Sequence, residues 1–137
     1  MWWIYALLSA FFAALTAIFA KIGIKNVDTD LATAIRTIVI LILAWAIAFL
    51  RGGASTISSL SKHNLIFLIL SGTATGLSWI FYFKALQLGK VSLVAPIDKL
   101  SVAFAIIFSI LFLGESISVK TAIGAICIIG GAVIIII

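Results

Sequence analysis

Long apolar stretches separated by short polar ones dominate the pattern of this chain. A helix needs about 20 apolar residues to cross a hydrocarbon layer of roughly 30 Å. Stretches that meet or approach this length end at charges or turn residues, and the last one is short but sufficient. They cover residues 2–20, 31–50, 64–83, 92–113 and 121–137. The pattern therefore predicts five transmembrane helices.

Strands do not fit this pattern, because barrel segments alternate in polarity over about 10 residues and these stretches are continuously apolar. The first stretch lacks the basic start of a secretory signal, so we interpret it as a retained span with interfacial tryptophans. Composition agrees, since 65% hydrophobic and 9% charged residues leave too little polar surface for a soluble globule. The expected fold class is an all-α membrane protein with one domain over residues 1–137.

The net charge of +5 has a topological explanation rather than a nucleic-acid one, because the basic residues are scattered through loops and span ends. Cytoplasmic loops attract Lys and Arg. With five spans, the side of the N-terminus carries three of these residues and the other side carries four. Arg36 and Lys99, just inside the second side, favour a cytoplasmic C-terminus. The bias is small, so insertion in both orientations stays open.

Charges inside the predicted spans give the first candidate site. At 1.5 Å per residue, Asp98 lies roughly 9 Å into the fourth span and Arg36 roughly 8 Å into the second, from the same membrane face. A charge facing lipid costs about 2.5–3.5 kcal/mol at the helix centre, so such residues turn inward and find partners. We predict that Arg36 pairs with Asp98. Lys99 points about 100° away from Asp98 on a helix and is expected to extend toward the interface.

Pro96 gives a second reason to place a site in the fourth span. Proline removes a backbone hydrogen bond, and unsatisfied backbone groups at membrane depth are tolerated beside protein or a water-filled cavity. Pro96, Asp98 and Ser101 together therefore indicate a binding site. The alternative is an internal salt bridge that only locks the second and fourth helices together.

The third span carries a stripe of hydroxyls with an aromatic beside it: Ser71, Thr75, Ser78 and Tyr82, with Trp79. Such a stripe is typical of a cavity wall. Alternatively, the hydroxyls bond back to carbonyls one turn earlier and only soften the helix. Both interpretations stay open, with Ser78, Trp79 and Tyr82 as candidate cavity residues.

Several of these residues fall in a run with a familiar pattern, ALQLGKVSLVAPIDKLSVAFAIIFSILFLGE, followed by GAICIIGGAVIIII. The run resembles the C-terminal part of an EamA-type domain of the drug/metabolite transporter superfamily. The resemblance covers the whole chain, including the arginine in the second span and the aromatic-rich end of the third. Members of that family are helical transporters, commonly with two inverted five-span repeats around a central cavity.

The resemblance implies that this chain holds one such repeat, the inverted-repeat half of a transporter bundle. A second copy or a related half-transporter would supply the other half, most simply as an antiparallel dimer. Ser101 stands where many relatives have a second proline, so a gating role of that proline does not carry over. The first span holds no acid, so proton coupling through a glutamate there, as in small four-span relatives, does not carry over either.

The resemblance marks Glu115 as a signature at the end of the fourth span. Physically, Gly114 is expected to end one helix, and Glu115 to favour the start of the next through the helix dipole. Glu115 is therefore interpreted as structural.

The resulting hypothesis is a half-size transporter of the inner (plasma) membrane that moves a small metabolite or drug-like solute by alternating access. Asp98 would be the protonatable or cation-binding group. Arg36 would be its counter-ion or the anchor for an anionic substrate. The cavity would be lined by Trp79, Tyr82, Ser78 and Ser101.

Two other classes compete with transport. The first is a membrane scaffold or accessory subunit that packs through glycine and alanine seams and transports nothing. The second, an enzyme, is not expected, because His63 stands alone near an interface and the sequence holds no paired carboxylates or HExxH motif. Cys127 also stands alone, so the sequence predicts no disulfide, metal centre or cofactor.

Overall fold

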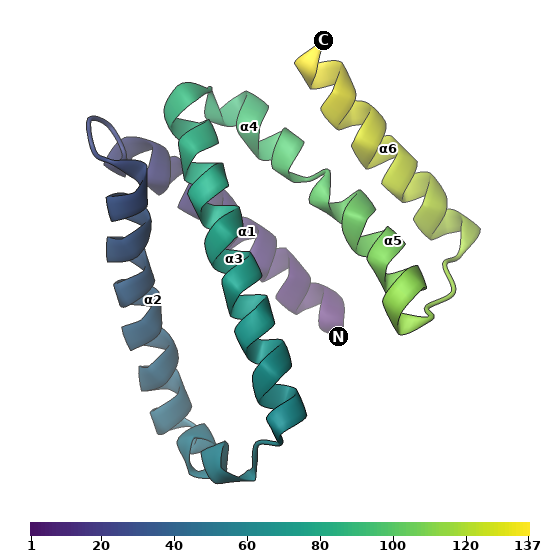
Figure 1. The fold of residues 1–137 in the computed structure, drawn as a ribbon. Helices are drawn as coiled ribbons and strands as arrows, with labels where there is room; N and C mark the ends of the chain where they lie inside the picture. Colours follow the sequence, from purple (N-terminus) through teal and green to yellow (C-terminus); the bar gives the residue numbers. More distant parts are fainter. The chain divides into compact units, whose positions relative to one another are not determined.

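A computed structural model describes residues 1–137 and consists of helices without strands (Figure 1). The α-helices are α1 (Trp2–Gly23), α2 (Thr29–Leu50), α3 (Lys62–Leu88), α4 (Val91–Asp98), α5 (Ser101–Leu113) and α6 (Val119–Ile136). Five spans are long and apolar enough to cross a membrane, with α4 and α5 together forming the fourth. The predicted all-α membrane fold is confirmed.

The helices divide between two compact units. One unit comprises Phe19–Gln87 and contains the end of α1 together with α2 and nearly all of α3. The other comprises Met1–Ile18 and Leu88–Ile137, and contains most of α1 together with α4, α5 and α6. Arg36 belongs to the first unit, and Asp98 belongs to the second.

In the unit Phe19–Gln87, α2 and α3 run in opposite directions and are joined through the short 3₁₀ helix η1 (Gly53–Ser59) (Figure 1). The start of α2 is fixed by Asp28, whose carboxylate accepts hydrogen bonds from the backbone N–H groups of Asp30 at 3.0 Å and Leu31 at 2.9 Å. These bonds satisfy donors that a helix start leaves unpaired. The sequence Asp-Thr-Asp is thus a helix start signal.

The connection between α2 and α3 had no predicted secondary structure, yet it forms η1. Gly52 begins it with φ of 73°, a left-handed conformation that glycine adopts without steric cost. The hydroxyls of Ser55, Thr56 and Ser59 each donate to the carbonyl three residues earlier, at 2.6, 2.7 and 2.7 Å. Short polar side chains that bond to the local backbone explain why this polar segment coils tightly.

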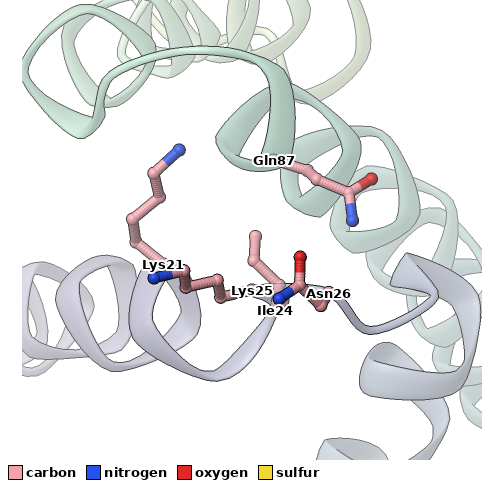
Figure 2. A pocket seen from close by; sticks show the side chains of 5 residues that line it. All are labelled: Lys21, Ile24, Lys25, Asn26 and Gln87. Carbon is pink, nitrogen blue, oxygen red and sulfur yellow. The ribbon is translucent and has the colours of Figure 1, made fainter.

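Side chains from the end of α1 and the following turn attach to the end of α3. The Lys21 ammonium donates to the Leu86 carbonyl oxygen, and the Gln87 amide donates to the Val27 carbonyl oxygen at 2.9 Å. Beside these bonds lies a cavity of about 420 Å³, whose lining side chains are drawn in Figure 2. Its lining residues are Lys21, Ile24, Lys25, Asn26 and Gln87.

In the other unit, α6 packs against both α4 and α5. As expected, Gly114 ends α5, with φ of 67°, and the N–H of Glu115 donates to the Ser109 carbonyl at 3.2 Å. The expectation for Glu115 at the next helix was wrong. Ser118 caps α6, accepting from the Thr121 N–H at 3.1 Å, and Glu115 lies outside the first turn of that helix.

Other boundaries differ from the hydropathy pattern where polar residues extend a helix. α1 continues past Lys21 to Gly23, and α3 continues past Phe83 to Leu88, including Lys84. The apolar pattern reports the part of a helix that crosses hydrocarbon, whereas capping groups and turns decide where the helix ends.

Most apolar side chains of both units are exposed, as in a protein whose solvent is lipid. Phe81 is 70% exposed and Leu68 58%, for example. The buried apolar residues are few: Ala17, Ile24, Phe83, Leu86 and Ala132. In the hydrocarbon region an exposed Leu or Phe carries no hydrophobic penalty, so packing and polar contacts must hold the helices.

Candidate functional site

The polar face of α2 is its buried face. Thr29 and Thr33 are the buried residues of this helix, at 4% and 6% exposure. The Thr33 hydroxyl donates to the Thr29 carbonyl at 2.8 Å, and the Thr37 hydroxyl donates to the Thr33 carbonyl at 2.8 Å. Arg36 lies three residues after Thr33 and one before Thr37, so helical spacing places it on or beside this face.

Aromatic rings of α3 hold the Arg36 guanidinium. Its central carbon, Cζ, lies over the Trp79 ring at 4.0 Å from the centroid and over the Phe83 ring at 5.0 Å. Phe83 is 1% exposed, so this ring is fixed in the packing. Both distances are within the roughly 6 Å over which a cation is attracted to an aromatic face. The predicted candidates Arg36 and Trp79 are therefore brought together.

One guanidinium nitrogen, Nη1, is buried and has no hydrogen-bond partner. Neither acid of the same unit, Asp28 or Asp30, forms an ion pair with Arg36. Buried polar groups in folded proteins nearly always have a partner, so an unpaired one needs an explanation.

The fourth span is interrupted at Lys99 and Leu100, between α4 and α5. The sequence had predicted one continuous helix here. Instead, the N–H groups of Lys99 and Leu100 donate to the carbonyls of Pro96 and Ile97, at 3.1 and 2.9 Å. These i to i+3 bonds tighten the chain into a 3₁₀ turn, which within a span often marks a functional hinge. Pro96 lies in the last turn of α4.

Asp98 and Lys99 form an ion pair at this interruption. The Lys99 ammonium is 3.4 Å from the Asp98 carboxylate, and the side chains are 55% and 37% exposed, respectively. Lys99 was expected to extend toward the interface; its flexible side chain instead reaches back to Asp98, the last residue of α4, and its position relative to the interface stays a prediction. The predicted Arg36–Asp98 pair joins residues of different units and stays a prediction.

The remaining candidates fall into two groups. Tyr82 is half-buried, and its phenol lies within electrostatic range of the Arg36 guanidinium, whereas Ser78 is exposed on α3. In the other unit, Ser101 is the first residue of α5 and is exposed. Within the hydroxyl stripe, Thr75 donates to the Ser71 carbonyl at 2.9 Å, so this hydroxyl follows the back-bonding alternative.

Sequence reasoning missed Phe83 and the threonines of α2 as parts of the Arg36 environment. A signal for both was present. Phe83 follows Trp79 by four residues, and Thr33 and Thr37 flank Arg36 at helical spacing, so each set shares one face of its helix. The aromatic pair Trp79 and Phe83 on α3 contacts Arg36 on α2.

Five candidate spans define a multi-pass membrane protein, and an arginine held within one of them is typical of a functional site. Comparison with known proteins agrees. The EamA-like transporter family matches residues 1–137. The chain is also 47% identical over 133 residues to a protein of Sinorhizobium sp. named "Uncharacterized transporter in cobO 3'region", covering 97% of this chain and 94% of that protein.

No solved structure matches the chain. The match to the family over the full range of residues, together with the close relative, decides the assignment: the chain belongs to the EamA-like transporter family. It is a membrane transporter, as the resemblance of its sequence motifs had implied.

Proposed function

We propose that this protein moves a small metabolite or drug-like solute across the inner (plasma) membrane by alternating access, working as half of a transporter. The interruption of the fourth span at the Asp98–Lys99 ion pair carries this proposal. Transport, rather than catalysis, is the activity that such an arrangement serves.

A 3₁₀ turn inside a span has poorer hydrogen-bond geometry than a continuous α-helix and often marks a functional hinge. In secondary transporters, discontinuous helices near the bilayer midplane form the binding sites for substrate and coupling ion. Ionisable residues at membrane depth mark the same pathways. Asp98 combines both features, because it is the last residue of α4.

We assign roles accordingly. Asp98 is the protonatable or cation-binding group, and Lys99 is its counter-ion in the state described here. Arg36 is either a second counter-ion of Asp98 or the anchor for an anionic substrate. Trp79, Tyr82 and Ser78 are the candidate cavity residues of the unit Phe19–Gln87, while Pro96 and Ser101 flank the interruption in the other unit.

A second copy in the opposite orientation, or a related half-transporter, would complete the cavity. The near-even distribution of basic residues permits both orientations, and the similar length of the relative fits a half-size transporter. A Cβ added at Gly72 or Gly76 would meet nothing within 4 Å, so this face of α3 is open to a neighbouring helix. If both orientations coexist in one membrane, a tag on either terminus should be accessible from each side of the membrane. A single orientation contradicts the antiparallel homodimer.

Flux measurements in proteoliposomes test the transport proposal. Three probes cover the main charge classes: benzoate as an anion, leucine as a zwitterion and ethidium as a cation. We expect flux of at least one probe above that of protein-free vesicles, and a loss of about tenfold or more in Asp98→Asn. Lys120→Gln, at the exposed start of α6, is the matched control and should keep its rate. Unchanged flux in Asp98→Asn contradicts the assigned role.

The scaffold alternative gives a different result when the two charges exchange places. Asp98→Lys combined with Lys99→Asp preserves an ion pair at the end of α4 but moves the carboxylate by one residue. A structural pair tolerates this exchange, so a scaffold keeps its stability and its assembly. A transporter keeps its stability but loses its flux.

A further inference from the structure

We propose that Arg36 binds the anionic group of the transported solute, and that the substrates are small organic monocarboxylates. This inference rests on the proposed transport function and narrows it. It chooses the substrate anchor over the counter-ion role for Arg36. Three observations support it: the aromatic contacts of the guanidinium, its unpaired donor and its uncompensated charge.

Two aromatic rings of α3 lie against the Arg36 guanidinium. Trp79 and Phe83 attract the cation through their rings, at 4.0 and 5.0 Å from Cζ. A ring attracts the cation but offers no oxygen or nitrogen acceptor to its N–H groups. The donors of an arginine lie in the guanidinium plane, in a fork whose spacing matches the two oxygens of a carboxylate. The ring contacts therefore hold the guanidinium without supplying the acceptor that its fork suits.

The edge has a vacant donor. Nη1 is buried and lacks any hydrogen-bond acceptor. Thr33 and Thr37, the nearest hydroxyls in the sequence of α2, direct their protons to carbonyls of their own helix. A buried charged donor without an acceptor is costly, and an arriving carboxylate oxygen would remove that cost.

The charge of the guanidinium is also uncompensated within its unit. Neither Asp28 nor Asp30 forms an ion pair with it, and Asp98 in the other unit already has Lys99 as a partner at 3.4 Å. A single positive charge favours a single negative charge, because a dianion such as a phosphate monoester would carry excess charge into the membrane. The apolar rings of Trp79 and Phe83 next to the fork suit an organic substituent on the carboxylate. These features select a monocarboxylate.

A binding measurement tests this inference without depending on transport. In a background with Trp2, Trp3 and Trp45 changed to Phe, Trp79 is the remaining tryptophan, and its fluorescence reports on the ring beneath the guanidinium. The detergent-solubilised protein is titrated with benzoate and with benzamide. The amide has nearly the same shape without the charge. We expect saturable binding of benzoate and none, or binding at least about tenfold weaker, for benzamide. Equal responses to both probes overturn the inference.

Two arginine variants separate the site from general basic charge. Arg36→Gln should weaken benzoate binding about tenfold or more, as expected for loss of a charged hydrogen bond. Arg51→Gln, at the exposed end of the same helix, should change it by less than about twofold. If Arg36→Gln loses its helical circular dichroism, Arg36→Lys replaces it, because lysine keeps the charge without the planar fork and should also bind benzoate more weakly. Unchanged binding in a folded Arg36 variant overturns the inference.

Asp98→Asn distinguishes the substrate anchor from the counter-ion role. If the site is free for a solute, this variant binds benzoate no more tightly than the parent. If Asp98 occupies Arg36, its removal strengthens benzoate binding about tenfold, and the inference fails. Failure of transport has a different signature. Benzoate then binds through Arg36 while none of the three probes crosses a membrane. If ethidium crosses the membrane but benzoate does not bind, the transport proposal holds and the monocarboxylate inference fails.

Discussion

The contact between Arg36 and Trp79 gives the sharpest energetic prediction. The guanidinium carbon is 4.0 Å from the centroid of the Trp79 ring, and Nη1 is excluded from solvent. Cation–π attraction ranges from about 0.5–1 kcal/mol at exposed sites to about 2 kcal/mol when the cation is desolvated, and tryptophan is the strongest ring. Because Phe83 at 5.0 Å stays in place, a change at Trp79 removes the closer of two ring contacts. We expect a coupling of about 1–2 kcal/mol.

A double-mutant cycle isolates this coupling from the other effects of each substitution. Arg36→Met removes the charge at similar length, Trp79→Leu removes the ring, and the double variant completes the cycle. Unfolding is followed by circular dichroism as sodium dodecyl sulfate is added to mixed micelles. The double variant should lose about 1–2 kcal/mol less unfolding free energy than the sum of the two single variants. This difference corresponds to about 5- to 30-fold in the folded-to-unfolded ratio.

The matched control is the cycle of Arg51→Met with Trp79→Leu. Arg51 follows Arg36 by 15 positions, roughly 22 Å along a helix axis, and is exposed. Changes this far apart add within about 0.3–0.5 kcal/mol. A coupling for Arg36 and Trp79 that is no larger than this control would refute the assignment of the ring as the group that orients the guanidinium.

Two further predictions concern the helix ends. Gly114→Ala should destabilise the protein by about 1–2 kcal/mol, because its φ of 67° is unfavourable for any residue with a Cβ, although an added Cβ meets nothing within 4 Å. Gly124→Ala, inside α6 with equally open space, should instead be neutral or stabilising by up to about 1 kcal/mol in the same unfolding assay. Ser118→Ala should cost about 1 kcal/mol through loss of the α6 cap, whereas Glu115→Gln should change stability by less than about 0.5 kcal/mol. Equal costs for Ser118 and Glu115 would contradict the capping assignment.

The number and type of the spans could be predicted because the thickness of hydrocarbon imposes a length on each apolar stretch. Gly114 could be predicted as a helix end because few residues other than glycine adopt its conformation. The interruption after Asp98 could not be located in the same way. No glycine marks it, and Pro96, in the last turn of α4, does not fix the residue at which the helix ends. Only the i to i+3 bonds of the folded chain reveal where the helix tightens.

The candidate site was predictable in part. Arg36, Asp98 and Trp79 stand out because charges and tryptophans are conspicuous among aliphatic residues. The contacts of Arg36 depend on how α3 is rotated about its own axis relative to α2. The sequence shows that Trp79 and Phe83 share a face of α3 but not which helix that face meets. The ion pair of Asp98 with its neighbour Lys99 depends likewise on α4 ending at that residue.

The burial of the polar face of α2, with its apolar face exposed, also affects which substitutions the helix tolerates. Its outward face consists of aliphatic residues such as Ile38, Leu41 and Ile42, each more than half exposed. Exchanges among Ile, Leu and Val there replace one lipid contact by an equivalent one. Thr29 and Thr33, by contrast, sit in the packed seam where an added methylene has little room. A saturation scan of α2 should therefore show that most apolar substitutions are tolerated on the aliphatic face and few substitutions at the threonines. In a water-soluble protein the buried, sensitive face of a helix is instead the apolar one.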